Sequence, residues 1–216
     1  MLWEPAIGSK EKTNYRALFA VRYGVPMPDL QGEERPAELP KLSADGTTIV
    51  ARLETQKIGV WSAATGKLRA LLVDDSLGDL RAWPSHDGTR VVTATGDRNM
   101  ALSDGLVDVA QVWDVASGVV VGHLAGEDGQ LYGAAYSPDG SMIVTESDGG
   151  TVRLWSALDL KLLRTLKVSE GRVLDAAFSS DGARLVTASR DSIARVWDVQ
   201  TLNPGPSGVS PHSRTG

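Results

Sequence analysis

The sequence predicts an all-β protein made of four consecutive antiparallel sheets of four strands each. Short alternating runs rich in Val, Leu, Ile and Thr recur along the chain, and each is bounded by Gly, Asp and Ser. Helical periodicity is not sustained in any part of the chain, and tryptophan returns at a regular interval. With 216 residues, 42% of them hydrophobic, the chain is long enough for such a domain to bury a core.

Tryptophans and Asp-Gly turns set the repeat. The four tryptophans of the repeat are Trp61, Trp113, Trp155 and Trp197. The last two intervals between them are both 42 residues, whereas the first is 52. An Asp-Gly turn precedes each tryptophan, and from Asp to Trp there are 16 residues in the first, third and fourth units but 26 in the second. One ten-residue insertion in the second unit therefore explains the irregular interval.

Each unit predicts the same order of strands. A short strand, the Asp-Gly turn, an alternating strand and a second tight turn lead to a strand that ends in Trp. A fourth strand follows in the first three units, at 67–72, 119–124 and 161–166. The fourth unit instead continues into Pro204 and Pro206, which are incompatible with a regular strand. Four antiparallel strands about every 42 residues are typical of a β-propeller blade.

The motifs resemble those of WD-repeat proteins. VWDV stands at 112–115 and again at 196–199, and SPDG at 137–140 is followed by VRLW at 152–155. The resemblance covers about 165 residues, and it implies four WD-repeat blades at 37–203. Rings of this family usually have about seven blades. We therefore expect a partial or incompletely closed propeller.

The resemblance also assigns structural roles. It places the four tryptophans of the repeat in the core or between blades, and it makes Asp148 and Asp191 the turn aspartates of the repeat. The family's Gly-His pair is missing at the matching places, so no unit keeps the complete His–Asp–Trp network. We therefore expect the blades to depend on apolar packing rather than on that network.

The two ends lie outside the repeat. Residues 1–36 form an N-terminal segment in which 14–23 has strand composition and is a candidate closing strand; the alternatives are a remnant of a preceding blade and a cap. Residues 204–216 are predicted to be a flexible tail. Three interpretations of the incomplete ring remain open. The chain is a fragment of a longer propeller, it completes a ring with another copy or with blades of another chain, or it stands as an open or small ring.

The resemblance places the family's docking surface on one propeller face. That face consists of the connections from each outer strand to the next inner strand, together with the turns between the second and third strands. These segments sum to a charge of about −7, against −5 for the whole chain, which favours a basic protein or peptide. The insertion adds a hairpin turn at Asp104-Gly105 with apolar neighbours. The candidate docking residues are Asp74, Asp75, Asp79, Met100, Leu102, Asp104, Leu106, Glu127 and Asp128.

Composition excludes several other functions. The chain has no cysteine, and its three histidines are not spaced as metal ligands, so we expect no metal site, no cofactor and no catalytic residues. The acidic balance argues against nucleic acid, and no apolar run is long enough for a membrane helix. The start of the chain lacks the pattern of a signal peptide, so we expect a cytoplasmic protein.

These exclusions leave a non-catalytic scaffold or adaptor that binds a protein or peptide. The alternative is a regulatory or sensor propeller fragment of a larger signalling protein such as a kinase or signalling ATPase. A propeller hydrolase is a remote third alternative.

Overall fold

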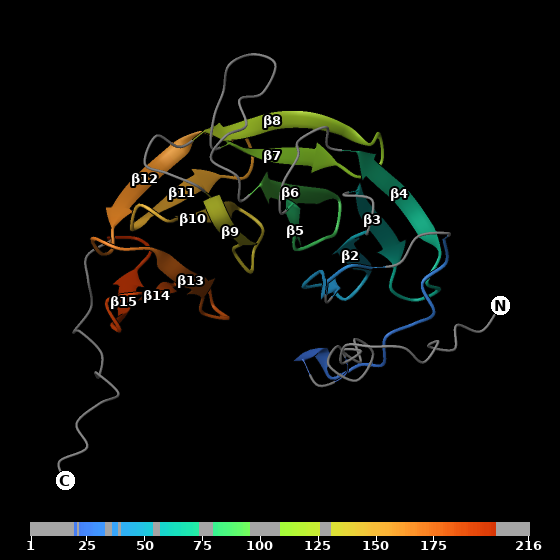
Figure 1. Ribbon diagram of the computed structural model, residues 1–216, viewed down its shortest axis with the longest axis horizontal. Coiled ribbons are helices and arrows are strands. Elements are labelled where there is room, and N and C mark those ends of the chain that lie inside the picture. The colour runs from blue at the N-terminus through green and yellow to red at the C-terminus, as the bar shows by residue number, and fades with distance from the viewer. Residues whose placement is uncertain are drawn as a thin grey trace, which may run out of the picture.

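A computed structural model shows four antiparallel sheets arranged as blades along an arc (Figure 1). The described residues are 20, 22–32, 36–38, 40–53, 57–73, 80–95, 109–125 and 131–201. Blade 1 comprises β1 (Lys41–Leu42), β2 (Thr48–Arg52), β3 (Lys57–Ser62) and β4 (Leu68–Val73). Blade 2 comprises β5 (Leu80–Pro84), β6 (Arg90–Thr95), β7 (Val109–Asp114) and β8 (Val119–Ala125). Blade 3 comprises β9 (Leu131–Tyr136), β10 (Met142–Ser147), β11 (Thr151–Ser156) and β12 (Leu162–Lys167). Blade 4 comprises β13 (Val173–Phe178), β14 (Arg184–Ser189) and β15 (Ala194–Asp198).

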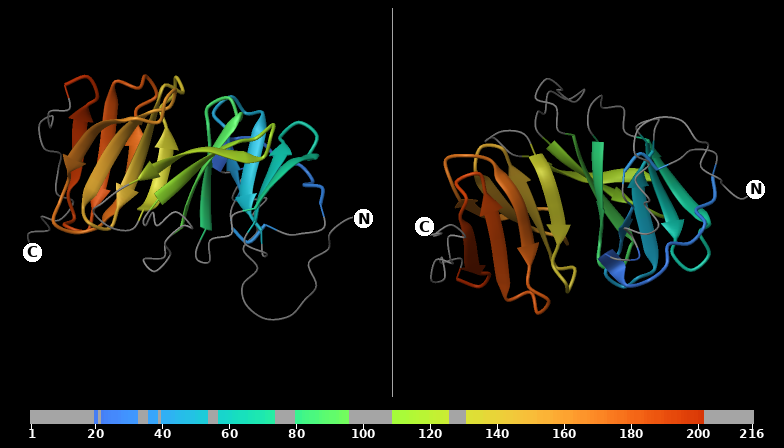
Figure 2. Two further views of the ribbon diagram at one scale, coloured as in Figure 1. Left: turned by 90° about the horizontal axis from the view of Figure 1, so that it is seen from above. Right: turned by 60° about the horizontal axis from the view of Figure 1, so that its bottom comes forward.

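The predicted all-β fold is confirmed. Strands are hydrogen-bonded in sequence order within each sheet, and the tryptophan-bearing strand is third in every blade. The outer strands β4, β8 and β12 line the convex side of the arc, while β5, β9 and β13 lie on its inner side (Figure 1). Blades 1 to 3 have four strands each, whereas blade 4 has three among the described residues. Figure 2 shows blades 1 and 4 standing at opposite ends of the arc.

The four Asp-Gly turns share one hydrogen-bonding scheme. In blade 3, the Ser137 hydroxyl donates to Asp139 Oδ1 at 2.6 Å and accepts from the backbone N–H of Met142 at 2.9 Å. Gly140 lies at φ +71°, in the left-handed region that favours glycine. Hydrogen bonds from the hydroxyl of Ser137, and from the backbone and side chain of Ser141, lower the pKa of Asp139 to about 2. The turn therefore depends on local side-chain chemistry, which explains why sequence alone located it.

The core lies between the blades. The face of a blade that points to the preceding blade is called its near face, and the face that points to the following blade is called its far face. Each buried cluster between two blades consists of the far face of one blade and the near face of the next. Val50, Ile58, Val60 and Leu72 of blade 1 pack against Leu80, Ala82, Val91 and Trp113 of blade 2. Equivalent clusters join blade 2 to blade 3 and blade 3 to blade 4. Sheet-on-sheet packing of this kind leaves one near face and one far face at the two ends of the arc.

The N-terminal segment covers the near face of blade 1. Tyr23, Met27 and Leu30 pack against a buried cluster that includes Ile49 and Trp61. The segment is also held by backbone hydrogen bonds, from Gln31 N to Gly66 O at 2.8 Å and from Ala37 N to Arg52 O at 2.8 Å. The described residues 22–32, 36 and 37 are therefore called the cap below, because they stand where a preceding blade would pack.

The candidate closing strand at 14–23 falls mostly outside the described residues. Its described residues, Ala20, Arg22 and Tyr23, are helical rather than extended, so these three do not belong to a strand. Tyr23 packs on blade 1, and among the residues that the structure describes β14 is the one strand that pairs with β15. Short helical geometry there lets Tyr23 reach the apolar face of blade 1, a contact that the strand composition of the segment did not indicate.

Candidate interaction surface

One edge of the sheets gathers the connections expected to form the docking face. In blade 1 the end of β4, Val73, pairs with Lys57, where the turn between β2 and β3 ends. In blade 2 the start of β5, Leu80, pairs with Thr95, where β6 ends. The outer-to-inner connections and the turns between second and third strands therefore leave the sheets at the same edge. This edge, with its connections, is called the loop face below.

All nine candidate docking residues lie outside the described residues. They belong to the connections 74–79, 96–108 and 126–130, and these three segments alone account for the charge of about −7. The connections of blades 3 and 4 at 148–150, 168–172 and 190–193 are described. Together with Lys167, these hold three basic and three acidic residues and are balanced in charge. The acidity of the loop face thus comes from blades 1 and 2 and from the start of blade 3.

The described part of the loop face is held by short local contacts. Lys167 Nζ donates to Gly149 O at 3.0 Å and lies 3.6 Å from a carboxylate oxygen of Glu170. The backbone N–H of Arg190 donates to Arg172 O at 3.0 Å, which joins the turn of blade 4 to the connection before it. A Cβ at Gly150 would lie 2.1 Å from Ser169 O, so glycine is required for this close approach.

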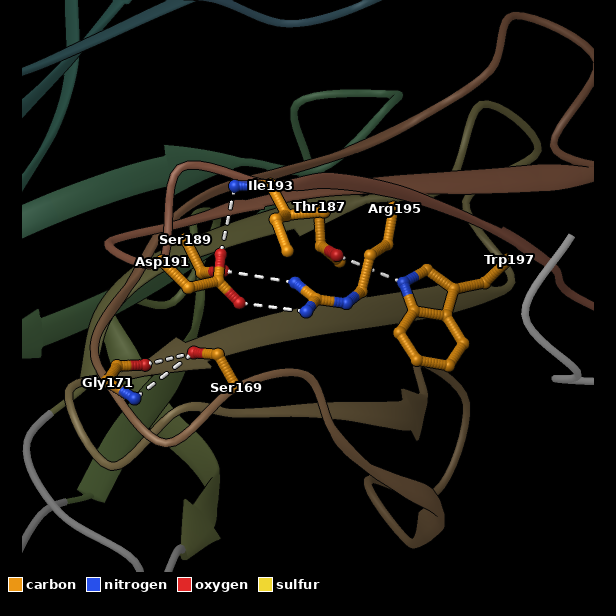
Figure 3. Close-up of polar contacts among 8 residues, drawn as sticks. All are labelled: Ser169, Gly171, Thr187, Ser189, Asp191, Ile193, Arg195 and Trp197. Carbon is orange, nitrogen blue, oxygen red and sulfur yellow. Dashed lines mark hydrogen bonds and ion pairs between the residues drawn. The ribbon is translucent and has the colours of Figure 1, made fainter. Parts of the chain in front are cut away.

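The turn aspartate of blade 4 is held by a set of partners different from the family network (Figure 3). Asp191 accepts hydrogen bonds from the Ser189 hydroxyl at 2.5 Å and from the backbone N–H of Ile193 at 3.0 Å. It also forms an ion pair with Arg195 at 2.8 Å. The contact with Arg195 and the hydrogen bond from Ser189 together lower the pKa of Asp191 to about 2. Ser169, at the place of the family histidine, donates to Gly171 O within its own loop. Asp148 lies in the corresponding turn of blade 3.

The repeat tryptophans are buried as predicted, but they are not held by apolar packing alone. Trp61, Trp113, Trp155 and Trp197 are between 1% and 7% exposed. In blades 2 to 4 the indole Nε1–H donates to a threonine Oγ on the second strand, at 2.9, 2.9 and 3.0 Å. In these three blades a threonine of the neighbouring strand satisfies the indole without histidine, so a direct Trp–Thr hydrogen bond supplements the apolar packing.

Trp61 departs from this scheme. Ala51 replaces the threonine of the other blades, and the Trp61 Nε1–H instead donates to Gln31 O of the cap at 2.8 Å. A Cβ at Gly59 would lie 2.1 Å from the Trp61 ring, so glycine leaves room for this ring position. The sequence analysis did not predict these two differences, although Ala51 and Gly59 at their repeat positions could have indicated them.

Two basic side chains lie against aromatic rings of the innermost strands β5 and β9. Lys41 Nζ donates to Ala82 O at 2.7 Å and lies 4.3 Å from the centre of the Trp83 ring, while burial lowers the pKa of Lys41 to about 8. Trp83 is half-buried under this ammonium group rather than fully in the core. The Arg172 guanidinium lies 3.6 Å from the centre of the Tyr132 ring.

Glu146 joins blade 3 to blade 4. Its Oε1 accepts a hydrogen bond from the backbone N–H of Ala176 at 2.8 Å, and its side chain is 5% exposed. A Cβ at Gly133 would lie 2.3 Å from its carboxylate, so glycine on the paired strand leaves the space. Burial raises the pKa of Glu146 to about 7, with a further contribution from the charge of Asp175.

A shallow cleft of about 450 Å³ separates the Asp-Gly turns of blades 2 and 3. His86, Arg90 and the half-buried Tyr136 line it. His123 lies exposed on the outer strand β8. Within the described part of the chain, no three histidine or acidic side chains come together as a metal site. The same described residues contain no helix long and apolar enough to cross a membrane.

Comparison with known families identifies the repeat. The family model for the WD domain, G-beta repeat, matches residues 117–156 and 160–198. Residues 117–156 and 160–198 thus match as two WD repeats. Members of the WD-repeat family are generally protein-interaction scaffolds. The matched residues include Trp155 and Trp197 and the turns that precede them.

Curated relatives contain WD repeats within longer chains. WD repeat and SOCS box-containing protein 1 of Danio rerio is 34% identical over 119 residues, which cover 53% of this chain and 25% of the relative. Transcription initiation factor TFIID subunit 5 of Drosophila melanogaster is 27% identical over 118 residues, 55% of this chain and 14% of the relative. Guanine nucleotide-binding protein subunit beta of Saccharomyces cerevisiae is 44% identical over 45 residues, 21% of this chain and 11% of the relative. The chain thus spans a quarter or less of the length of these relatives.

The boundaries of the WD repeats do not coincide with the boundaries of the blades. The first match begins before β8, the outer strand of blade 2, and ends with β11, the tryptophan strand of blade 3. The second match runs from β12 of blade 3 to β15 of blade 4. Each repeat therefore supplies the outer strand of one blade and the first three strands of the next. The second match ends with β15, and blade 4 has no outer strand among its described residues.

Proposed function

We propose that this chain is a non-catalytic scaffold or adaptor module whose loop face binds a basic protein or peptide. The observation that carries the proposal is the strand register, which brings the ends of the three acidic connections to one edge of the sheets. Loops on a rigid scaffold are the usual place for binding residues. A face with an excess of negative charge attracts cationic partners and speeds their encounter.

The insertion in blade 2 is separable from the fold. Ala94 pairs with Ala110 across it, whereas Ala188 pairs with Ala194 in blade 4 with residues 189–193 between them. Deleting 98–107 would leave five residues between Ala94 and Ala110, the same number as in blade 4. The blade therefore does not require these ten residues, and they are available for binding.

The deletion tests the binding role directly. We expect the chain without 98–107 to keep its melting temperature, because the shortened turn matches the other blades, and to lose partners in a pull-down. The intact chain and a chain with Asp97→Asn, which changes charge within the same connection without shortening it, serve as controls. Identical partner sets for the intact and deleted chains would reject the insertion as a binding element.

Charge reversal tests the acidic loop face. Replacing Asp74, Asp75 and Asp128 by Lys should slow association with a bound partner mainly at low salt, because exposed charges act through long-range attraction that ions screen. The control replaces the same three aspartates by Glu, which keeps the charge at each position. Binding that strengthens with added salt would contradict the proposal.

A regulatory or sensor role within a larger signalling protein stays a prediction, since no contact in the described residues favours it over a scaffold. A cytoplasmic location likewise stays a proposal.

A further inference from the structure

The cleft between the Asp-Gly turns of blades 2 and 3 gathers three side chains that do not follow the repeat. His86, Tyr136 and Leu158 come from three separate segments, and all of them line this cleft. Each stands at a position where the other blades have a different kind of side chain. Residues that break a local rule without a structural benefit are expected at functional sites.

The hydroxyl group of Tyr136 is not needed for packing. In blade 4 the equivalent residue is Phe178, which pairs with Leu185 as Tyr136 pairs with Ile143. Both rings pack against the cluster between their own blade and the preceding blade. The Tyr136 hydroxyl is screened from solvent and has no hydrogen-bond partner among the described residues. Because a buried polar group without a partner costs free energy, this hydroxyl carries a cost that Phe178 avoids.

His86 adds a second polar atom without a partner. Its backbone is fixed, since Asp45 N in the turn of blade 1 donates to His86 O at 3.0 Å. Its side chain lies against the turn of blade 3, where a Cβ at Gly140 would be 3.6 Å from His86 Cβ. The ring is partly exposed, but its Nδ1 is buried and has no hydrogen-bond partner within the described part of the chain. The other three turns have Ala44, Pro138 and Ser180 at this position.

Leu158 adds an exposed apolar group to the same cleft. It lies in the turn after the tryptophan strand of blade 3, and its side chain is 87% exposed. This turn is tied to blade 2, because Arg90 Nη1 donates to Ala157 O at 2.6 Å. The equivalent positions of the other blades hold Ala64, Ala116 and Gln200. The turn therefore does not require a large apolar side chain at this position.

The charges of the cleft favour a cationic ligand. Two exposed carboxylates, of Asp87 and Asp139, line it together with one guanidinium group, that of Arg90. The guanidinium already donates to Ala157 O, whereas the carboxylates face solvent. A site with an excess of negative charge attracts a positive group. Pockets for small molecules enclose most of the ligand, but Leu158 offers a one-sided apolar contact, as for a peptide lying on a surface.

We propose that this cleft binds a short peptide segment of a partner protein in which an apolar side chain stands next to a basic one. The apolar side chain packs on Leu158, and the basic side chain lies toward the carboxylate of Asp139. A peptide group has one donor and one acceptor, which match the Tyr136 hydroxyl and the imidazole of His86. Because the Tyr136 hydroxyl and His86 Nδ1 are screened from solvent in the unbound chain, side chains of the cleft change rotamer on binding.

The cleft and the loop face lie at opposite edges of the sheets. In blade 2, Pro84 pairs with Val91 beside the Asp-Gly turn, whereas Leu80 pairs with Thr95 at the loop face. The proposal therefore does not rest on the proposed function, and it can fail or succeed separately from it.

Selection from a displayed library of random short peptides tests the cleft. The whole chain is the bait, and the triple variant His86→Ala, Tyr136→Phe and Leu158→Ala is used for counter-selection. Each substitution introduces the residue that another blade has at that position, so the variant should keep the fold. We expect peptides that prefer the unaltered chain to contain an apolar residue next to Lys or Arg. A selection without such a preference, or peptides without this pair of residues, would overturn the proposal.

Single substitutions separate binding from folding. Tyr136→Phe should weaken binding of a selected peptide by about threefold to tenfold in a fluorescence anisotropy titration. It should not lower the melting temperature, because it removes a buried group that has no hydrogen-bond partner among the described residues. A melting temperature that falls while the affinity is unchanged would show that the hydroxyl supports the fold, and it would overturn its role in binding.

Leu158→Ala should weaken binding of the same peptide by about fivefold or more, since it removes the apolar contact. Leu162→Ala is the matched control, because Leu162 lies on the outer strand β12 of the same blade and is 48% exposed. Equal losses of affinity for these two variants would contradict the assignment of the peptide to the cleft.

Discussion

Replacing Trp155 by Ala measures how much one blade interface contributes to stability. The Trp155 side chain is 4% exposed and packs in the cluster between blades 2 and 3. Removing a large buried aromatic costs about 3–5 kcal/mol, from lost burial and from the cavity that remains. The change also leaves the Thr145 hydroxyl, 1% exposed, without its indole donor. An unsatisfied buried group adds about 1–3 kcal/mol unless water replaces the donor. The loss is therefore a large part of the stability of a typical domain, about 5–15 kcal/mol.

Denaturant unfolding followed by far-ultraviolet circular dichroism should show this loss as a lower midpoint. Leu158→Ala is the control, because Leu158 is 87% exposed and should change stability by less than about 0.5 kcal/mol. Thr145→Val in both backgrounds separates the hydrogen bond from the packing in a double-mutant cycle. A loss below about 1 kcal/mol for Trp155→Ala would refute the packing argument, because no buried indole of this size could be removed at so small a cost.

Two further predictions concern the cap and the joint between blades 3 and 4. Gly59→Ala should lower the free energy that holds the cap on blade 1 by about 1–3 kcal/mol, because a Cβ would overlap the Trp61 ring. Hydrogen exchange at the backbone N–H of Gln31, which donates to Gly66 O, measures this loss. Unchanged protection of that N–H would contradict the role of glycine. Glu146 has its pKa raised from 4.5 to about 7 in the folded state, so its favourable contribution is complete below about pH 4.5 and is lost as the pH rises toward 7. Glu146→Gln keeps an acceptor for Ala176 N and should raise stability by on the order of 2 kcal/mol at pH 8 while flattening the pH dependence between 4.5 and 7. Melting curves across that range check it, and an unchanged slope would contradict the assignment.

The sequence predicted which connections contain the candidate site, but not how the site residues are arranged. Sequence placed the insertion between β6 and β7, and the structure pairs Ala94 with Ala110 on either side of it. The nine candidate docking residues fall in connections whose ends meet at one edge, but the structure does not describe the residues themselves. A repeat pattern indicates which strands a connection joins but not the path of the connection, because loops vary more than the strands that they join.

Sequence by itself determined the number of blades, the turns and the tryptophan strands. These features repeat and are local, since a Ser-x-Asp-Gly turn satisfies its own hydrogen bonds within about five residues, as Ser137 and Asp139 show. Successive side chains along each strand then lie on opposite faces of the sheet. Local chemistry and period are therefore sufficient for this part of the fold.

Only the tertiary structure decided what covers each blade. The cap on blade 1, the bond from Trp61 to Gln31 and the bond from Ala176 to Glu146 join residues about 30 positions apart. No local pattern specifies such contacts, because they depend on which sheets pack together and how closely the backbones approach. The residues of β6 recur in β14 in the sequence, but the structure was needed to show that Val92 is 0% exposed and the equivalent Val186 is 40% exposed.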